Sequence, residues 1–170
     1  MTLKLKELKQ KIREWRHDPL RFIEETVYIR GADGKNRPIK LWPLQREAIK
    51  KLGSPDKYGR YPYHTIWFCW PRRIGKSTLT GTLALWSFAV WPGREVWFVS
   101  NSREQVYNVL FQQLREYILN SPILLRLIGG KENVGKREIT SSLMGSRCAL
   151  LPYDDSKCVG LKVDCAVMSE

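Results

Sequence analysis

A short run near the middle of the chain has the residue types and the spacing of a phosphate-binding site. Residues 70–77 read Trp-Pro-Arg-Arg-Ile-Gly-Lys-Ser, between an apolar run and a helical stretch. Gly75 would let the backbone turn its amides toward an anion, and Lys76 would reach the terminal phosphates of a nucleotide. Ser77 offers a hydroxyl to Mg²⁺ at the positive end of the helix, and Thr78 is a further candidate contact. The motif therefore predicts a phosphate-binding loop.

Two arginines inside this loop are candidates for the chemistry of phosphoryl transfer. An arginine close to the γ-phosphate stabilises the charge that spreads onto the transferring group. Only one of two adjacent side chains can point inward, so we assign the catalytic role to Arg72 and a supporting anion contact to Arg73. The structural alternative is that both are solvated loop cations. The loop departs from the usual pattern at its front, where Trp70 replaces the first glycine.

The elements around the loop alternate between strand and helix. Residues 66–70 are a short run of β-forming residues, and a long helical stretch follows over residues 76–90. Residues 95–100 predict a second strand, and a helix with a capped start at residue 101 runs to residue 119. This order predicts a parallel sheet covered by helices, the α/β class of P-loop nucleotide triphosphatases.

A helical segment is expected in front of the sheet. Apolar residues recur at helical spacing over residues 5–15, and Asp18 before Pro19 can cap a second helix. Residues 30–37 are rich in glycine and predict a loop, and residues 44–52 predict another helix.

The last third of the chain predicts a hairpin and a final strand. Residues 137–143 and 147–151 flank a short turn, and residues 165–168 form an apolar run. We therefore divide the chain into a helical lead-in, residues 1–60, and the first part of an ATPase domain, residues 61–170.

Composition and charge limit the class of protein. The 170 residues are 43% hydrophobic, include seven Trp and can bury a sizeable core. The net charge is +12, and residues 1–60 carry 16 Lys/Arg against 8 Asp/Glu. Such an excess suits a polyanionic partner, although a solvated basic helix over residues 1–16 is the alternative. The apolar runs are too short to span a membrane, and no signal peptide is indicated, so we expect a soluble cytoplasmic protein.

Taken in order, these motifs resemble the ATPase domain of the large terminase subunit, the motor that packages DNA into tailed-phage and herpesvirus capsids. In that family an arginine stands three places before the loop glycine, as Arg72 stands before Gly75. Residues 41–45 resemble the family's adenine-recognition motif, in which Gln45 would bond the adenine edge. Residues 100–105 resemble the strand end and helix start that follow the loop.

The end of the chain also resembles this family. Gly160 stands ten places before Glu170, the family's usual distance from that glycine to the catalytic glutamate. The resemblance implies a P-loop ATPase fold of the ASCE type, with the sheet incomplete at the C-terminus, and ATP and Mg²⁺ as cofactors. It implies that Glu170 polarises water and Arg72 stabilises the transition state. The implied nucleotide contacts are Gln45, Arg72, Arg73, Gly75, Lys76, Ser77 and Thr78, and the implied metal contacts are Ser77 and Ser169.

Two features depart from the family pattern. The family has an Asp-Glu pair after its second acidic-motif strand, whereas here Ser169 precedes Glu170, so the aspartate that orients Mg²⁺ is missing. Asp154 and Asp155 are a weaker substitute, because Pro152 interrupts the strand before them. The chain also ends at Glu170, whereas a terminase continues into a nuclease domain. We therefore expect an incomplete motor that binds ATP weakly and hydrolyses it slowly or not at all.

One further aspartate, Asp164, lies five residues before Ser169 and is expected at the opposite end of the last strand, in a capping or solvent role.

The resemblance also implies partners and a location. These are double-stranded DNA, the portal protein and the small terminase subunit, with a homo-oligomeric ring at the procapsid portal in the host cytoplasm. Two alternatives remain open. One is a helicase-like translocase built from the same parts, and the other is a module that binds nucleotide, nucleic acid or capsid without hydrolysis.

Overall fold

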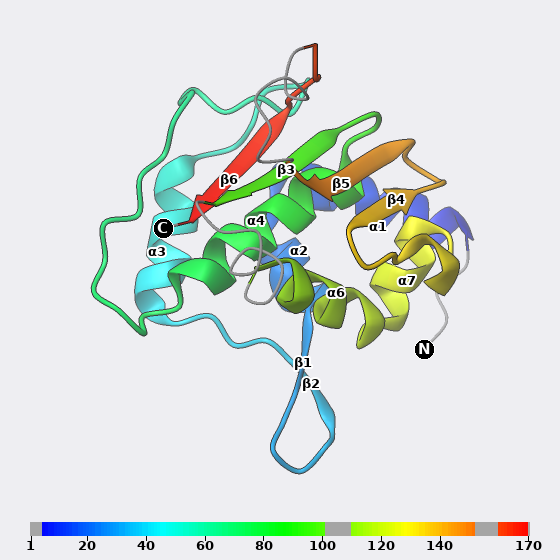
Figure 1. The fold of residues 1–170 in the computed structure, drawn as a ribbon, viewed down its shortest axis with the longest axis horizontal. Coiled ribbons are helices and arrows are strands. Elements are labelled where there is room, and N and C mark those ends of the chain that lie inside the picture. Colours follow the sequence, from blue (N-terminus) through cyan, green and yellow to red (C-terminus); the bar gives the residue numbers. More distant parts are fainter. Residues whose placement is uncertain (1–4, 101–109, 152–159, 170) are drawn as a thin grey trace.

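A sheet with strand order β4-β5-β3-β6 forms the frame of the molecule (Figure 1). The computed structural model describes residues 5–100, 110–151 and 160–169. The interior strand, β3 (Glu95–Ser100), lies parallel to both of its neighbours. Those neighbours are β5 (Ser146–Leu150) and β6 (Cys165–Ser169).

The edge strand β4 (Glu138–Ser141) runs antiparallel to β5, and the two form the predicted hairpin. In the middle of the sheet Val96, which is 1% exposed, lies opposite Cys148 and Cys165. The expected α/β class, helices against a mostly parallel sheet, is therefore confirmed.

The central helix, α4 (Lys76–Val90), has the bounds predicted from the sequence. It is apolar around most of its circumference, as expected for a helix that is covered on several sides. It contacts β3, β5 and β6 on one side and the N-terminal helices on another. Leu85 and Phe88 are fully buried. Helix α4 begins directly after Gly75, so its first turn marks the end of the loop over residues 70–75.

The N-terminal segment packs on α4 as two short helices, α1 (Leu5–His17) and α2 (Pro19–Thr26). The Asp18 side chain accepts a hydrogen bond of 2.9 Å from the Arg21 amide, which confirms the predicted cap. Trp86 of α4 donates its indole N–H to the Trp15 carbonyl over 2.6 Å. A third helix, α3 (Pro43–Leu52), follows and contacts α2.

Two helices precede the β4–β5 hairpin. They are α6 (Gln112–Leu119) and α7 (Pro122–Ile128), and a 3₁₀ turn, η2 (Lys131–Asn133), follows them. The predicted helix from residue 101 to residue 119 is confirmed in its C-terminal part, because residues 101–109 lie outside the described residues. No helix in the described part of the chain is long and apolar enough to cross a membrane.

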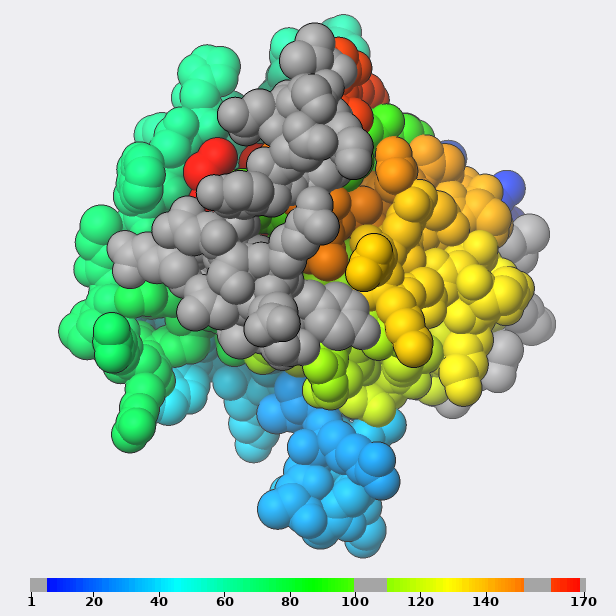
Figure 2. Space-filling model, in the orientation of Figure 1, coloured from blue at the N-terminus to red at the C-terminus, as the bar shows by residue number. Residues whose placement is uncertain are grey.

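The predicted loop over residues 30–37 is instead the tip of a β-hairpin. The strands β1 (Tyr28–Arg30) and β2 (Asn36–Pro38) pair antiparallel, with Ile29 opposite Arg37. The glycines that suggested a loop lie between the strands, where they form the turn. Figures 1 and 2 show this hairpin standing out from the body of the molecule.

The predicted strand over residues 66–70 is wrong. These residues have no regular secondary structure, and Trp67 is 80% exposed. A β-forming run becomes a strand only when a neighbour completes its ladder of hydrogen bonds. Residues 66–70 make no backbone–backbone hydrogen bond to any other described residue, and β6 pairs only with β3 in the described sheet.

Candidate phosphate-binding site

The loop ends in a glycine whose backbone starts the central helix. Gly75 has φ 75° and ψ 34°, a left-handed conformation, and its carbonyl accepts from the Leu79 amide over 3.0 Å. Side chains other than glycine rarely adopt this conformation. A Cβ at this position would also lie 2.5 Å from the Gln45 side-chain nitrogen. The left-handed backbone and the close Gln45 side chain both favour glycine at position 75. This agrees with the role in shaping the loop that the sequence predicts for Gly75.

The side chain of Lys76, the residue after this glycine, joins the two ends of the loop. Lys76 Nζ donates to the Trp70 carbonyl over 2.5 Å, which joins the first residue of the loop to the start of α4. The side chain is half-buried. An ammonium has three donors, so this bond leaves two for an anion above the loop.

Gln45 lies against the back of the loop. Its side-chain nitrogen donates to the Gly75 carbonyl over 3.0 Å and to the Ile74 carbonyl over 3.4 Å. Its side-chain oxygen accepts from the Trp42 amide over 2.9 Å, at the start of α3. The residue is 4% exposed. Both ends of the amide are therefore used within the protein, and the adenine contact suggested for Gln45 remains a prediction.

The two loop arginines are both exposed, and neither forms an ion pair with another described residue. Arg73 has φ 67° and is the one residue other than glycine with positive φ in the described chain. This conformation costs a side-chain-bearing residue on the order of 1–2 kcal/mol. Arg73 and Gly75 both have a left-handed backbone. Only Arg73, which carries a side chain, is strained by it.

The first turn of α4 carries two hydroxyl side chains, Ser77 and Thr78, with different surroundings. Ser77 is half-buried, and its side chain makes no hydrogen bond with another described residue. Thr78 Oγ1 instead accepts from the Gln113 side chain on α6 over 3.4 Å. Burial raises the pKa of Tyr117. Sequence reasoning missed this contact between α4 and α6, and the spacing of the residues gives no signal for it.

The acidic end of the site is described only in part. β6 ends at Ser169, whose backbone lies opposite Ser100 on β3, and β6 also packs against α4. In Figure 1 the carboxyl end of β6 lies on the same side of the molecule as the start of α4. Glu170 and the pair Asp154 and Asp155 lie outside the described residues.

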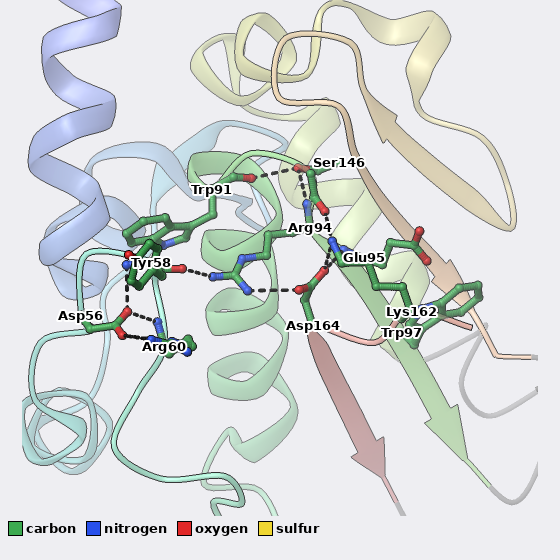
Figure 3. A network of polar contacts seen from close by, with 11 residues as sticks. Asp56, Tyr58, Arg60, Trp91, Arg94, Glu95, Trp97, Ser146, Lys162 and Asp164 are labelled. Atoms are coloured by element: carbon green, nitrogen blue, oxygen red, sulfur yellow. Dashed lines mark hydrogen bonds and ion pairs between the residues drawn. The ribbon is translucent and has the colours of Figure 1, made fainter. Parts of the chain in front are cut away.

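Asp164 lies at the other end of β6, where it holds the amino ends of two strands together (Figure 3). Its carboxylate accepts from the Glu95 amide over 2.9 Å and pairs with Arg94 at 3.3 Å and Lys162 at 2.9 Å. Burial opposes ionisation of Asp164, but the Glu95 amide and the two cations outweigh it and hold its pKa below the usual value. The expected capping role away from the loop is confirmed.

Arg94 extends this network to the segment in front of the phosphate loop. Its guanidinium donates to the Tyr58 carbonyl over 2.5 Å, and Asp56 accepts from the amides of Tyr58 and Arg60 (Figure 3). The segment before residues 66–70 is thus attached to the amino ends of the strands.

No group of three or more His, Cys, Asp or Glu side chains suited to a metal ion occurs in the part of the chain that is described. Comparison with protein-family models gave no match, and comparison with curated proteins gave none either.

Proposed function

We propose that this chain is the ATP-hydrolysing part of a DNA-packaging motor of the large-terminase kind. The observation that carries the proposal is the turn formed by Gly75, Lys76 and Ser77. A left-handed glycine, a lysine that spans the loop and a serine hydroxyl that bonds to no other described residue meet at the N-terminus of α4. These groups, together with the helix dipole, are the parts that bind a nucleotide triphosphate.

Each group of the loop has a distinct part in the proposed reaction. Lys76 binds the terminal phosphates, and Arg72 stabilises the charge that develops on the transferring phosphoryl group. Ser77 holds Mg²⁺, which neutralises phosphate charge when it is bound. Arg73 and Thr78 are the further nucleotide contacts in this proposal. Phosphoryl transfer needs mainly positioning and charge compensation, and these residues supply both.

The water that attacks the γ-phosphate would be polarised by Glu170, as the family resemblance implies. Ser169 occupies the place of the family's aspartate and has a hydroxyl that can accept from a metal-bound water, but no charge. ATP is therefore proposed to bind better than it is hydrolysed.

The partner of the motor is proposed to be double-stranded DNA. The net charge of +12 supports this, because Lys and Arg near a phosphate backbone release condensed counterions. The portal protein, the small terminase subunit and a ring of identical subunits complete the proposed assembly, at the procapsid in the host cytoplasm.

A second candidate function, nucleotide or DNA binding without hydrolysis, is favoured by one observation. Ser169 cannot lend Mg²⁺ the negative charge that an aspartate would. A helicase-like translocase would share the same loop and differ in the nucleic acid that stimulates it.

Release of inorganic phosphate from ATP tests these alternatives directly. It should be measured with Mg²⁺, with and without double-stranded and single-stranded DNA, for the native chain and for Lys76→Ala. The motor proposal predicts release that depends on Lys76 and rises with duplex DNA. Stimulation by single strands alone would favour the helicase-like reading, and binding without any release would favour the non-hydrolysing one.

A further inference from the structure

The β1–β2 hairpin stands out from the body of the described chain (Figures 1 and 2). Its charged side chains are mostly cations. We propose that this hairpin contacts the phosphate backbone of double-stranded DNA. The choice of DNA as the polyanion rests on the proposed function. The geometry and the charge of the hairpin are independent of that function.

The turn of the hairpin is built by its own hydrogen bonds. The Gly31 amide donates to the Lys35 carbonyl over 2.9 Å, and the Gly34 amide donates to the Gly31 carbonyl over 2.9 Å. Asp33 accepts from the Lys35 amide over 3.2 Å, and Gly34 has φ 75°. A turn fixed in this way loses little conformational freedom when it binds a partner.

The root of the hairpin is anchored in the body of the molecule. The Ile39 amide donates to the Val27 carbonyl over 2.9 Å, and both side chains are buried. Asn36 donates to the Asn120 carbonyl over 3.2 Å at the end of α6, and α6 also contacts β1. The hairpin is therefore held at its base and exposed along its length.

The charge on this hairpin is strongly unbalanced. Residues 28–40 carry four cations, Arg30, Lys35, Arg37 and Lys40, and a single carboxylate, Asp33. All four cations are exposed. Asp33 pairs with Arg37 at 2.6 Å, and Lys35 and Lys40 form no ion pair with another described residue. A projecting surface with this excess of positive charge attracts a polyanion.

The exposed hairpin is better suited to DNA than the basic helix α1 is. Within α1, Lys11 is paired with Glu25 at 2.9 Å, and Arg16 donates to the Val90 carbonyl over 2.8 Å. Those two cations are therefore already bonded within the protein, whereas Lys6, Lys9 and Arg13 of α1 remain exposed and are the alternative that a test must compare. A two-stranded β-ribbon also fits the major groove of B-DNA, where cations along its edges reach phosphates on either side.

The test compares two double variants that remove equal charge from the full chain. Lys35→Gln with Lys40→Gln alters the two hairpin cations that form no ion pair with another described residue, and Lys6→Gln with Lys9→Gln alters the exposed face of α1. Fluorescence anisotropy of a labelled duplex of mixed sequence, measured over a salt series, gives the slope of log affinity against log salt. Circular dichroism confirms that each variant is folded.

We expect the hairpin variant to lower the magnitude of that slope by about two, because each lost phosphate contact removes about 0.9. The α1 variant should change it by well under one. An equal or larger fall for the α1 variant would overturn the proposal. Displacement of the duplex by poly-glutamate at equal charge would also overturn it and would indicate an acidic protein partner.

The outcome separates this inference from the proposed function. ATP binding, followed with a fluorescent ATP analogue, should be the same in the hairpin variant and the native chain. If the native chain binds ATP but not duplex DNA at low salt, the hairpin proposal fails while the phosphate loop stands. If it binds DNA through the hairpin but not ATP, the proposed function fails instead.

Discussion

Gln45 donates to the carbonyl of Gly75 over 3.0 Å, although the two residues are separated by 30 positions in the chain. The contact places the start of α3 against the proposed phosphate loop. A Cβ at position 75 would lie 2.5 Å from the Gln45 side-chain nitrogen, so a larger residue there would displace this contact.

The first prediction concerns the role of Gln45. Gln45→Ala removes the donor to Gly75 and the acceptor for the Trp42 amide, so we expect a loss of about 1–3 kcal/mol in the free energy of unfolding. Affinity for ATP and CTP should fall by the same factor, because the loop is displaced whichever base is bound. A loss confined to ATP would instead establish the adenine contact implied by the family resemblance. Titration with both nucleotides distinguishes the two roles.

The second prediction separates backbone strain from charge in the loop. Arg73→Gly relieves the left-handed conformation at φ 67° but adds freedom to the unfolded chain, so the two effects should nearly cancel, to within about 1 kcal/mol. Arg72→Gly is the matched control, because Arg72 is not in the left-handed region and gains no such relief. Urea unfolding should therefore show the larger loss for Arg72→Gly. An equal loss would mean that Arg73 is not strained.

A third prediction follows from the ionised state of Asp164. Its pKa is lowered in the folded protein, so its stabilising contribution is complete above the usual value of about 3.9 and is lost as pH falls through the lower folded value. Asp164→Asn should destabilise the protein at neutral pH and reduce the fall of stability in acid. Urea unfolding at a series of pH values measures this. An unchanged acid dependence would contradict the assigned interactions.

The fourth prediction tests the docking of the N-terminal helices on α4. Trp15 is 1% exposed, and its carbonyl accepts from Trp86, whereas Trp67 is 80% exposed. We expect Trp15→Ala to cost about 3–5 kcal/mol of unfolding free energy. Trp67→Ala, which removes the same side chain from the surface, should stay within about 0.5 kcal/mol. Similar losses for both would mean that residues 66–70 are packed in solution.

The sequence predicted those elements that are stabilised by contacts between neighbouring residues or that extend over a long run of apolar residues. Helix α4 follows from a sustained apolar stretch with a glycine in front, and the α2 cap follows from Asp18 before Pro19. The β4–β5 hairpin follows from two β-forming runs around a short turn.

The contacts that were not predictable depend on which segments meet in space. Residues 66–70 have the composition of a strand. A strand also needs a partner strand to pair with, and a local sequence pattern does not show whether one is present. The contacts of Gln45 with the loop and of Thr78 with α6 join segments far apart in the chain. The phosphate-binding roles of Lys76 and Ser77 remain predictions from residue types, and those types gave no sign of the side chains that hold the loop in place.

Binding of ATP with Mg²⁺ to the native chain and to Lys76→Ala, followed by isothermal titration calorimetry, is the most direct test of the phosphate-loop assignment. Lys50→Ala, which removes an exposed lysine from α3, is the control for charge. The assignment predicts that Lys76→Ala remains folded and loses about 1.5–3 kcal/mol of binding free energy, a factor of roughly ten or more, while Lys50→Ala binds as the native chain does. Native ATP affinity in a folded Lys76→Ala protein would contradict it.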